Sequence, residues 1–306
     1  MTMATIVSGS EGVSTLVAAL RNGDVVGFPT ETVYGLAADI RNDDALQKVF
    51  AVKGRPTSHP LIVHIADPEQ LRELTTEMSV ACEALTRVCW PGPLTVIVRA
   101  SVRVSRICTG GRDTVAVRLP AHPLAQRVIR ELGAPVAAPS ANRFGHVSPT
   151  TAQHVVDDLG NDINVVLDGG ASDVGVESSI VDCTVNPPQI LRHGAITPED
   201  IRQILASCGT EVVLDSSGPS RAPGMLDRHY APRARLVLHE TVDAVPDDGA
   251  PVLRCDSNLV EVARHLYDQL RDLDARHIPV AHVVLPARQG LGYAIRDRLS
   301  KAAAGL

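Results

Sequence analysis

The chain has 306 residues, of which 44% are hydrophobic and 21% charged; this composition is typical of a globular protein with room for two domains and excludes disordered or fibrous chains. Aromatic residues make up 3% and the net charge is -6, which argues against an aromatic platform for single-stranded nucleic acid and against a global field that attracts polyanions. Any anion-binding site must therefore be local.

Up to residue 207, hydrophobic periodicity and Gly/Pro punctuation predict helices that interleave with buried strands. The expected helices are 11–22, a helix capped by Asp43 or Asp44 that ends near Lys53-Gly54, 79–89, 122–132, 150–159 and 198–207. The expected strands are 25–28, 61–65, 94–99, 114–118, 135–138, 164–167, 178–182 and 189–192. This order lacks strict βαβ regularity, so we expect an α/β fold with a twisted mixed sheet and flanking helices.

A stretch rich in Gly, Pro and Ser, residues 215–224, divides the chain. We therefore predict a first domain over 1–207, a linker over 208–233 and a small α/β domain over 234–306. The small domain is expected to contain strands at 235–239 and 280–285 and helices at 257–272 and 292–303. Because so short a chain supports only a marginal core, we expect this domain to lean on the first.

The cysteines and the N-terminus indicate the compartment. Six cysteines form no Cys-x-x-Cys pair and show no regular spacing, so we expect reduced thiols and neither a zinc ribbon nor a disulfide framework. The N-terminus has no basic segment before an apolar core, and no apolar run approaches the ~18 residues that span a bilayer. We expect a cytoplasmic protein with no membrane contact.

Polar side chains gather on loops that follow the predicted strands, whereas the familiar glycine-rich nucleotide signatures are absent. The set comprises Thr30, Thr32, Tyr34, Lys53, Arg55, His59, His64, Thr114, Arg118, Ser140, Asn142, Ser148, Ser178, Ser179 and Arg192. One Lys with several Arg and hydroxyl groups is what a phosphate chain needs. Simpler interpretations stay open: Lys53 and Arg55 could complement a helix dipole, and His64 could be a satisfied core residue. Arg118 ends an apolar strand and must find an anion or solvent.

Eight ordered motifs across about residues 24–194 resemble those of the L-threonylcarbamoyladenylate synthases, the YrdC-like family. They are Phe28–Leu36, Lys53–Pro56 with His59–His64, Trp90–Thr95, Thr114–Pro120, Ala138–Asn142, Ser148–Thr150, Gly175–Ser179 and Leu191–Arg192. Ala222–Met225 and Arg228–Pro232 are similar to the linker of the long, two-domain form, although the second domain looks shortened between Glu240 and Asn258. The resemblance implies a YrdC-like fold with a concave basic cleft.

The resemblance also implies the reaction. It implies a nucleotidyltransferase that forms threonylcarbamoyl-AMP and pyrophosphate from L-threonine, bicarbonate or carbon dioxide, and ATP, for the threonylcarbamoyladenosine modification of tRNA. Mg²⁺ would be held mainly through ATP, with no metal ligand from the protein. A downstream tRNA threonylcarbamoyl transfer machinery would receive the product.

The same resemblance assigns roles to individual residues. The catalytic residues would be Lys53 and Arg55. The ATP-binding residues would be Lys53, Arg55, His59, Thr114, Ser140, Asn142, Ser148, Arg192, His229 and Tyr230. The threonine-binding residues would be Thr32, His64, Arg118, Ala138 and Ser178, with Arg118 as the clamp for the carboxylate. His229 or Tyr230 of the linker would close over the nucleotide as part of a lid.

Two other functions stay open at this point. A double-stranded RNA- or tRNA-binding module would use the concave basic surface, at least for weak RNA binding, but the net charge of -6 and the scarcity of aromatic residues count against it. A carbamoyl-handling paralogue would use another acceptor or amine. Two sets of residues argue against such a paralogue. The intact set Lys53, Arg55, Ser140 and Asn142 favours the use of ATP. The residues Thr32, His64, Arg118 and Ser178 favour threonine.

Overall fold

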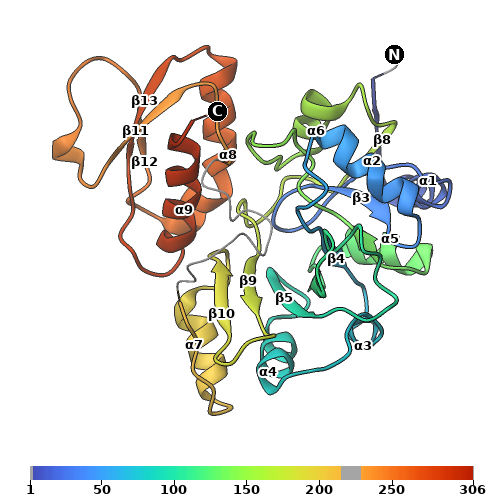
Figure 1. The fold of residues 1–306 in the computed structure, drawn as a ribbon. Coiled ribbons are helices and arrows are strands. Elements are labelled where there is room, and N and C mark those ends of the chain that lie inside the picture. The colour runs from blue at the N-terminus through green and yellow to red at the C-terminus, as the bar shows by residue number, and fades with distance from the viewer. Residues whose placement is uncertain (1–2, 215–228, 306) are drawn as a thin grey trace.

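The computed structural model describes residues 3–214 and 229–305 (Figure 1). The chain builds a ten-stranded sheet and, after the undescribed segment, a separate three-stranded sheet. Ala222–Met225 and Arg228 of the predicted linker lie outside the described residues. The boundaries drawn at 207 and 234 therefore stay predictions.

The large sheet has the strand order β1-β8-β2-β3-β7-β4-β6-β5-β9-β10. Its strands are β1 (Thr5–Ser8), β2 (Val26–Phe28), β3 (Gly35–Asp39), β4 (Ile62–His64), β5 (Leu94–Arg99), β6 (Thr114–Arg118), β7 (Val136–Ala137), β8 (Val165–Asp168), β9 (Ser179–Asp182) and β10 (Gln189–Arg192). The sheet contains parallel pairs, such as β4 with β6, and antiparallel pairs, such as β6 with β5. The predicted α/β fold with a mixed sheet is confirmed.

Seven helices of the described chain accompany this sheet. They are α1 (Gly9–Arg21), α2 (Asp43–Lys53), α3 (Glu69–Leu74), α4 (Val80–Cys89), α5 (Pro123–Leu132), α6 (Ala152–Leu159) and α7 (Pro198–Ala206). One apolar cluster includes Leu46 and Phe50 of α2, and a second includes Leu16 of α1 and Ile129 of α5. Burial of these aliphatic faces stabilises the fold, as the low aromatic content required.

Helix α2 illustrates how local sequence places a basic loop. Its N-cap is Asn42, whose side chain accepts a hydrogen bond from the Ala45 N–H at 3.0 Å, so the predicted cap at Asp43 or Asp44 was wrong by one or two positions. Gly54 ends the helix in the left-handed region, with φ 64°. Lys53 is therefore the last helical residue, and Arg55 begins the loop.

Strands β1, β3 and β12 (Val252–Arg254) and helix α3 were not predicted. The sequence of β3 is Gly-Leu-Ala-Ala-Asp, which lacks β-branched residues and carries no local strand signal. Backbone pairing with β2 on one side and β7 on the other makes it a strand. Tertiary pairing therefore overrides propensity at this position.

The second unit is a three-stranded parallel sheet with two long helices. Its strands are β11 (Arg235–His239), β12 and β13 (Val280–Val284) in the order β11-β13-β12, and its helices are η1 (Val242–Ala244), α8 (Leu259–Ala275) and α9 (Gly292–Ala303). Figure 1 shows α8 and α9 between this sheet and the first unit. Its apolar cluster includes Val33, Val147 and Val176 of the first unit, which confirms that the small domain leans on the large one.

The described residues bear on two expectations from composition. All six cysteines are free, and five of them are buried. Between residues 3 and 214 and between 229 and 305, none of the helices combines the length and apolarity that crossing a membrane requires.

Candidate active site

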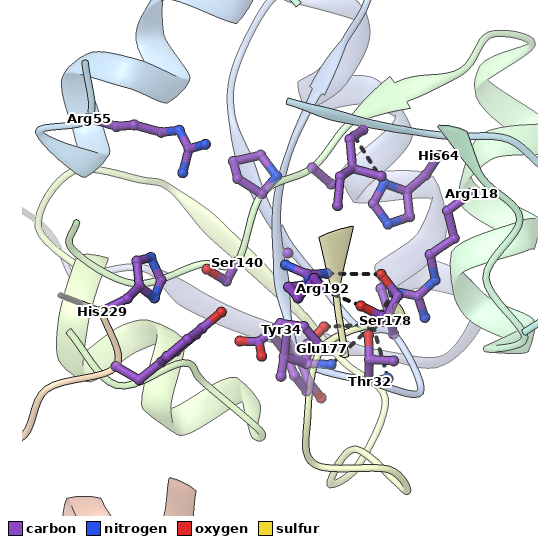
Figure 2. Close-up of a pocket in the computed structure, with 17 residues that line it drawn as sticks. Thr32, Tyr34, Arg55, His64, Arg118, Ser140, Glu177, Ser178, Arg192 and His229 are labelled. Carbon is purple, nitrogen blue, oxygen red and sulfur yellow. Dashed lines mark hydrogen bonds between the residues drawn. The ribbon is translucent and has the colours of Figure 1, made fainter. Parts of the chain in front are cut away.

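A cavity that opens to solvent lies where ends of the large sheet meet the segment that leads into the second unit. It is lined by Thr30, Thr32, Val33, Tyr34, Gly35, Arg55, Ile62, His64, Arg118, Ala138, Pro139, Ser140, Glu177, Ser178, Arg192, His229 and Tyr230. Figure 2 shows two ends: Thr32, His64 and Arg118 lie at one, and Arg55 and His229 lie at the other. Three arginines make this cavity a site for anions.

The polar turn after β2 forms one wall. The Thr30 hydroxyl donates to the Val33 carbonyl at 2.6 Å and accepts the Thr32 and Val33 N–H groups, so a side chain holds the turn closed. Tyr34, which is fully buried, donates its hydroxyl to the Gly170 carbonyl at 2.7 Å. The turn predicted as the edge of a site is therefore held rigidly against the cavity.

Arg118 ends β6 and lies in register with His64 at the end of the parallel strand β4. Its Nη1 donates to the Thr32 hydroxyl at 2.7 Å, and its Nη2 lies 2.6 Å from a carboxylate oxygen of Glu31. Burial raises the pKa of Glu31, but the Arg118 charge together with hydrogen bonds from Arg118 and from backbone N–H groups outweighs burial, and the pKa is lowered. The predicted clamp thus already has a buried anionic partner, which the sequence analysis did not identify.

His64 is a neutral hydrogen-bonding group at this end. Burial, assisted by the neighbouring Arg118 charge, lowers its pKa to about 3. Its Nδ1 lies 3.2 Å from the Ile62 carbonyl oxygen, which only accepts, so Nδ1 carries the proton. The Nε2 lone pair is then left to accept a hydrogen bond.

Ser178 is fixed by two neighbours, from β5 and β10. Its hydroxyl lies 2.7 Å from that of Thr95, and Arg192 donates to the same hydroxyl at 3.0 Å. Arg192 also donates through Nε to the Ser178 carbonyl at 3.0 Å. Arg192 therefore lies between the two ends of the cavity and contacts Ser178, as Figure 2 shows.

The other end of the cavity carries Arg55, Ser140, His229 and Tyr230. Burial lowers the pKa of Arg55 to about 10 and that of His229 to about 3, so the first stays cationic and the second neutral near pH 7. The rings of His229 and Tyr230 meet edge to face at 4.1 Å. Tyr230 adopts the left-handed φ of 63°, which is costly for a bulky residue and is maintained by its surroundings.

Five residues of the predicted ATP set do not line the cavity. Lys53 points its ammonium at the carbonyls of Ser140, at 2.5 Å, and Asn142, at 2.6 Å, so it supports the loop that carries Ser140. Burial, with the nearby Arg55 charge, lowers the Lys53 pKa well below its usual value. The other four are His59, Thr114, Asn142 and Ser148. All five predicted threonine-binding residues, by contrast, line one cavity.

The carboxylates of Glu31 and Glu177 were missed. Each adjoins a residue that the sequence analysis did select, Thr32 and Ser178 respectively, and each lies within a quoted motif. A carboxylate inside so basic a set must pair with a cation, and that was the available signal. Within the described chain, no group of three or more His, Cys, Asp or Glu residues is arranged to hold a metal ion.

A mixed α/β sheet that carries an arginine-lined cavity beside a second α/β unit is typical of an enzyme that binds small anionic molecules. Residues 18–194 match the family model Sua5_yciO_yrdC, described as telomere recombination, and residues 196–304 match the model of the threonylcarbamoyl-AMP synthase C-terminal domain. The chain belongs to this family, in its two-domain form. The resemblance drawn from the motifs is confirmed.

Relatives match over nearly the whole chain. The threonylcarbamoyl-AMP synthase of Pyrococcus abyssi is 38% identical, with 92% of this chain and 91% of that protein aligned. That of Bacillus subtilis is 39% identical, over 94% of this chain and 92% of its own. The crystal structure of P. abyssi Sua5 complexed with L-threonine superposes with a TM-score of 0.91 at 36% identity and covers 98% of both chains.

Proposed function

We propose that this protein is an L-threonylcarbamoyladenylate synthase, a nucleotidyltransferase that joins L-threonine, bicarbonate or carbon dioxide, and ATP into threonylcarbamoyl-AMP with release of pyrophosphate. The observation that carries the proposal is one cavity with Thr32, His64 and Arg118 at one end, Arg55 and His229 at the other, and Arg192 between them. The relatives named threonylcarbamoyl-AMP synthase support it. The product serves the threonylcarbamoyladenosine modification of tRNA.

L-threonine is assigned to the end that holds Thr32, His64, Arg118, Ala138 and Ser178. Arg118 would bind the substrate carboxylate while it keeps its contact with Glu31. The neutral His64 offers Nε2 as an acceptor for the hydroxyl or the amine of threonine. The complex of P. abyssi Sua5 with L-threonine supports a threonine subsite in this fold.

ATP is assigned to the cationic end, where Arg55, Ser140, Arg192, His229 and Tyr230 line the cavity. Lys53 would contribute without contacting the nucleotide, because it fixes the loop that carries Ser140 and adds positive potential to the cavity. The proposed contacts of His59, Thr114, Asn142 and Ser148 require the nucleotide to extend beyond the cavity or the loops to adjust. A closing role for the linker likewise stays a prediction, since residues 215–228 of the predicted linker lie outside the described residues.

The reaction suits this arrangement. The threonine amine attacks carbon dioxide and loses a proton, and an oxygen of the resulting N-carboxylate attacks the α-phosphorus while the bond to pyrophosphate breaks. Two anions must approach each other, so Arg55, Arg192 and Lys53 would lower the barrier by stabilising the phosphate charge. No covalent bond to the protein is required. Partial exclusion of water by the walls of the cavity would protect the carbamate from hydrolysis.

Other participants are proposed on weaker support. Glu31 and Glu177 are each paired with an arginine, so the described residues provide no free carboxylate set for Mg²⁺, which would be held through the ATP phosphates. A tRNA threonylcarbamoyl transfer machinery would consume the product, and weak RNA binding stays a prediction. The six free cysteines support a cytoplasmic location.

The decisive assay is pyrophosphate release by the purified full chain with ATP, Mg²⁺ and bicarbonate. L-threonine, L-serine and no amino acid are compared, and the nucleotide product is identified by mass. Release that requires threonine and yields threonylcarbamoyl-AMP supports the proposal. Saturable ATP binding without release would favour the carbamoyl-handling paralogue or the RNA-binding module.

A further inference from the structure

A buried ion pair joins the second unit to the cavity. Arg298 of α9 is fully buried, and its Nε donates to a carboxylate oxygen of Glu177 at 2.7 Å. Glu177 itself lines the cavity. The two residues lie 121 positions apart in the sequence, so the contact exists only when the second unit is docked.

The second unit holds Glu177 with two side chains. Tyr267 of α8 donates its hydroxyl to the same carboxylate oxygen at 2.8 Å, and Ser148 donates to the other oxygen at 2.6 Å. Arg298 also donates to the carbonyl of His193, the residue after Arg192, at 3.0 Å. One guanidinium thus fixes both the carboxylate in the cavity wall and the backbone next to a cavity-lining arginine.

Arg298 and Tyr267 also contact the ring of Tyr230. The Arg298 guanidinium carbon lies 5.1 Å from the centre of the Tyr230 ring, and the Tyr267 ring stacks on it at 5.7 Å with planes 25° apart. These contacts hold Tyr230 in its left-handed conformation. The second unit therefore shapes the nucleotide end of the cavity from outside it.

Charge explains why an arginine is placed there. A carboxylate in the wall of a phosphate-binding cavity repels the ligand, or captures a nearby cation such as Arg192, unless another charge compensates it. Arg298 supplies that compensation from the side away from the cavity. A buried ion pair contributes little stability compared with apolar packing, so stability alone does not account for a charged residue on the apolar face of α9.

We propose that Arg298 is a positioning residue for ATP. From the second domain it neutralises the Glu177 carboxylate and holds the Tyr230 ring in place. A cavity that binds the nucleotide therefore forms only when that domain is docked. This inference rests on the proposed function for the identity of the nucleotide. It gives the second domain a direct part in substrate binding.

The test measures binding of α,β-methylene-ATP, whose α–β bridge resists cleavage, to the full chain by calorimetry. Arg298→Met should weaken binding about tenfold or more, because Glu177 loses its main counter-charge and then competes with the phosphates for Arg192. Adding Glu177→Gln to Arg298→Met removes that charge, and binding should recover to within about threefold of the wild type, a coupling typical of contacting residues. If Arg298 only stabilised the contact between the domains, adding Glu177→Gln would not restore nucleotide binding.

Arg271→Met is the matched control. Arg271 of α8 makes another ion pair across the same interface, with Asp158 at 2.8 Å, but does not line the cavity. We expect a lower melting temperature with binding within about twofold of the wild type. Tyr267→Phe keeps the ring on Tyr230 and loses one hydrogen bond to Glu177, so it should fold and weaken binding about threefold.

Three outcomes would overturn the inference. The first is equal weakening by Arg298→Met and Arg271→Met, and the second is no recovery in the double variant. The third is that the single variants Tyr267→Phe and Arg298→Met both bind like the wild type. In the synthase assay, KM for ATP should rise in Arg298→Met while KM for L-threonine stays within about twofold. If the wild type binds the analogue but forms no threonylcarbamoyl-AMP, the proposed function fails while the binding test of Arg298 still holds.

Discussion

The carboxylate of Glu31 lies 2.6 Å from the guanidinium of Arg118, and the two side chains are only 8% and 4% exposed. Arg118 simultaneously donates to the Thr32 hydroxyl. A substrate carboxylate at this end of the cavity must therefore share the guanidinium with a resident anion. Under the proposed assignment of L-threonine to this end, its affinity depends on that competition and is sensitive to both Glu31 and Arg118.

Replacing Arg118 by Ala should raise KM for L-threonine by about tenfold or more, with a smaller change for ATP, because a charge-assisted hydrogen bond to the carboxylate is lost. Steady-state pyrophosphate release checks this. Arg99→Ala, an exposed arginine on β5 paired with Asp113, is the control. Equal losses for the two substrates would contradict the assignment of the clamp. Arg118→Lys, which keeps a charge beside Glu31, covers the case in which the alanine variant does not fold.

Glu31→Gln should act in the opposite direction. Without the resident carboxylate, Arg118 is free to bind the substrate, so KM for L-threonine should fall by about twofold to fivefold. The melting temperature should drop, since one member of a buried ion pair is removed. An increase in KM would mean instead that Glu31 holds Arg118 in the orientation that threonine requires.

Lys53→Ala should reduce pyrophosphate release by about 10²-fold, because the variant loses a preorganised charge and the support of the Ser140 loop. Lys48→Ala is the matched control on the same helix, since the Lys48 ammonium donates to the Gly23 carbonyl away from the cavity. Near-normal release by Lys53→Ala would restrict this lysine to a role in ending helix α2.

Protonation of His64 should destabilise the folded protein in acid. Its pKa is lowered from 6.5 to about 3 by burial and by Arg118, with Glu31 opposing, so the unfolded chain binds the extra proton between these values. The stabilising effect is complete above pH 6.5 and is lost as pH falls toward 3, by up to about 1.4 kcal/mol per pH unit.

His64→Gln should therefore flatten the fall of the melting temperature between pH 6.5 and 4. Buried His229, whose pKa is lowered in the same direction, leaves part of the slope in place. His265→Gln, a change at an exposed position of α8, should leave the slope unaltered. Parallel curves for His64→Gln and the wild type would show that His64 does not titrate in this window.

The ends of two neighbouring strands show how much of the candidate site the sequence predicts. His64 and Arg118 each end an apolar run that the hydrophobic pattern identifies as a strand, and the ends of adjacent parallel strands meet at one edge of a sheet. Local pattern therefore places these two side chains near each other. Their assignment to threonine follows from the family resemblance and stays a proposal.

The direction of the Lys53 side chain could not be predicted from local sequence pattern. Its position at the end of α2 followed from Gly54, but the direction of its ammonium, toward the Ser140 and Asn142 carbonyls, depends on a loop more than eighty residues away. Strand β3 likewise took its form from its two neighbours and not from its own residues. Such features need the packed structure, because the deciding partner is distant in sequence.

The sequence by itself determined the family, the α/β class, the division of the chain into two units and the residues that line the His64 and Arg118 end of the cavity, because each depends on short-range pattern or on ordered motifs. The tertiary structure alone decided which charges pair: Glu31 with Arg118, and Glu177 with Arg298 across the domain interface. Coulomb interactions depend on distance and burial in space. No spacing along the chain encodes them.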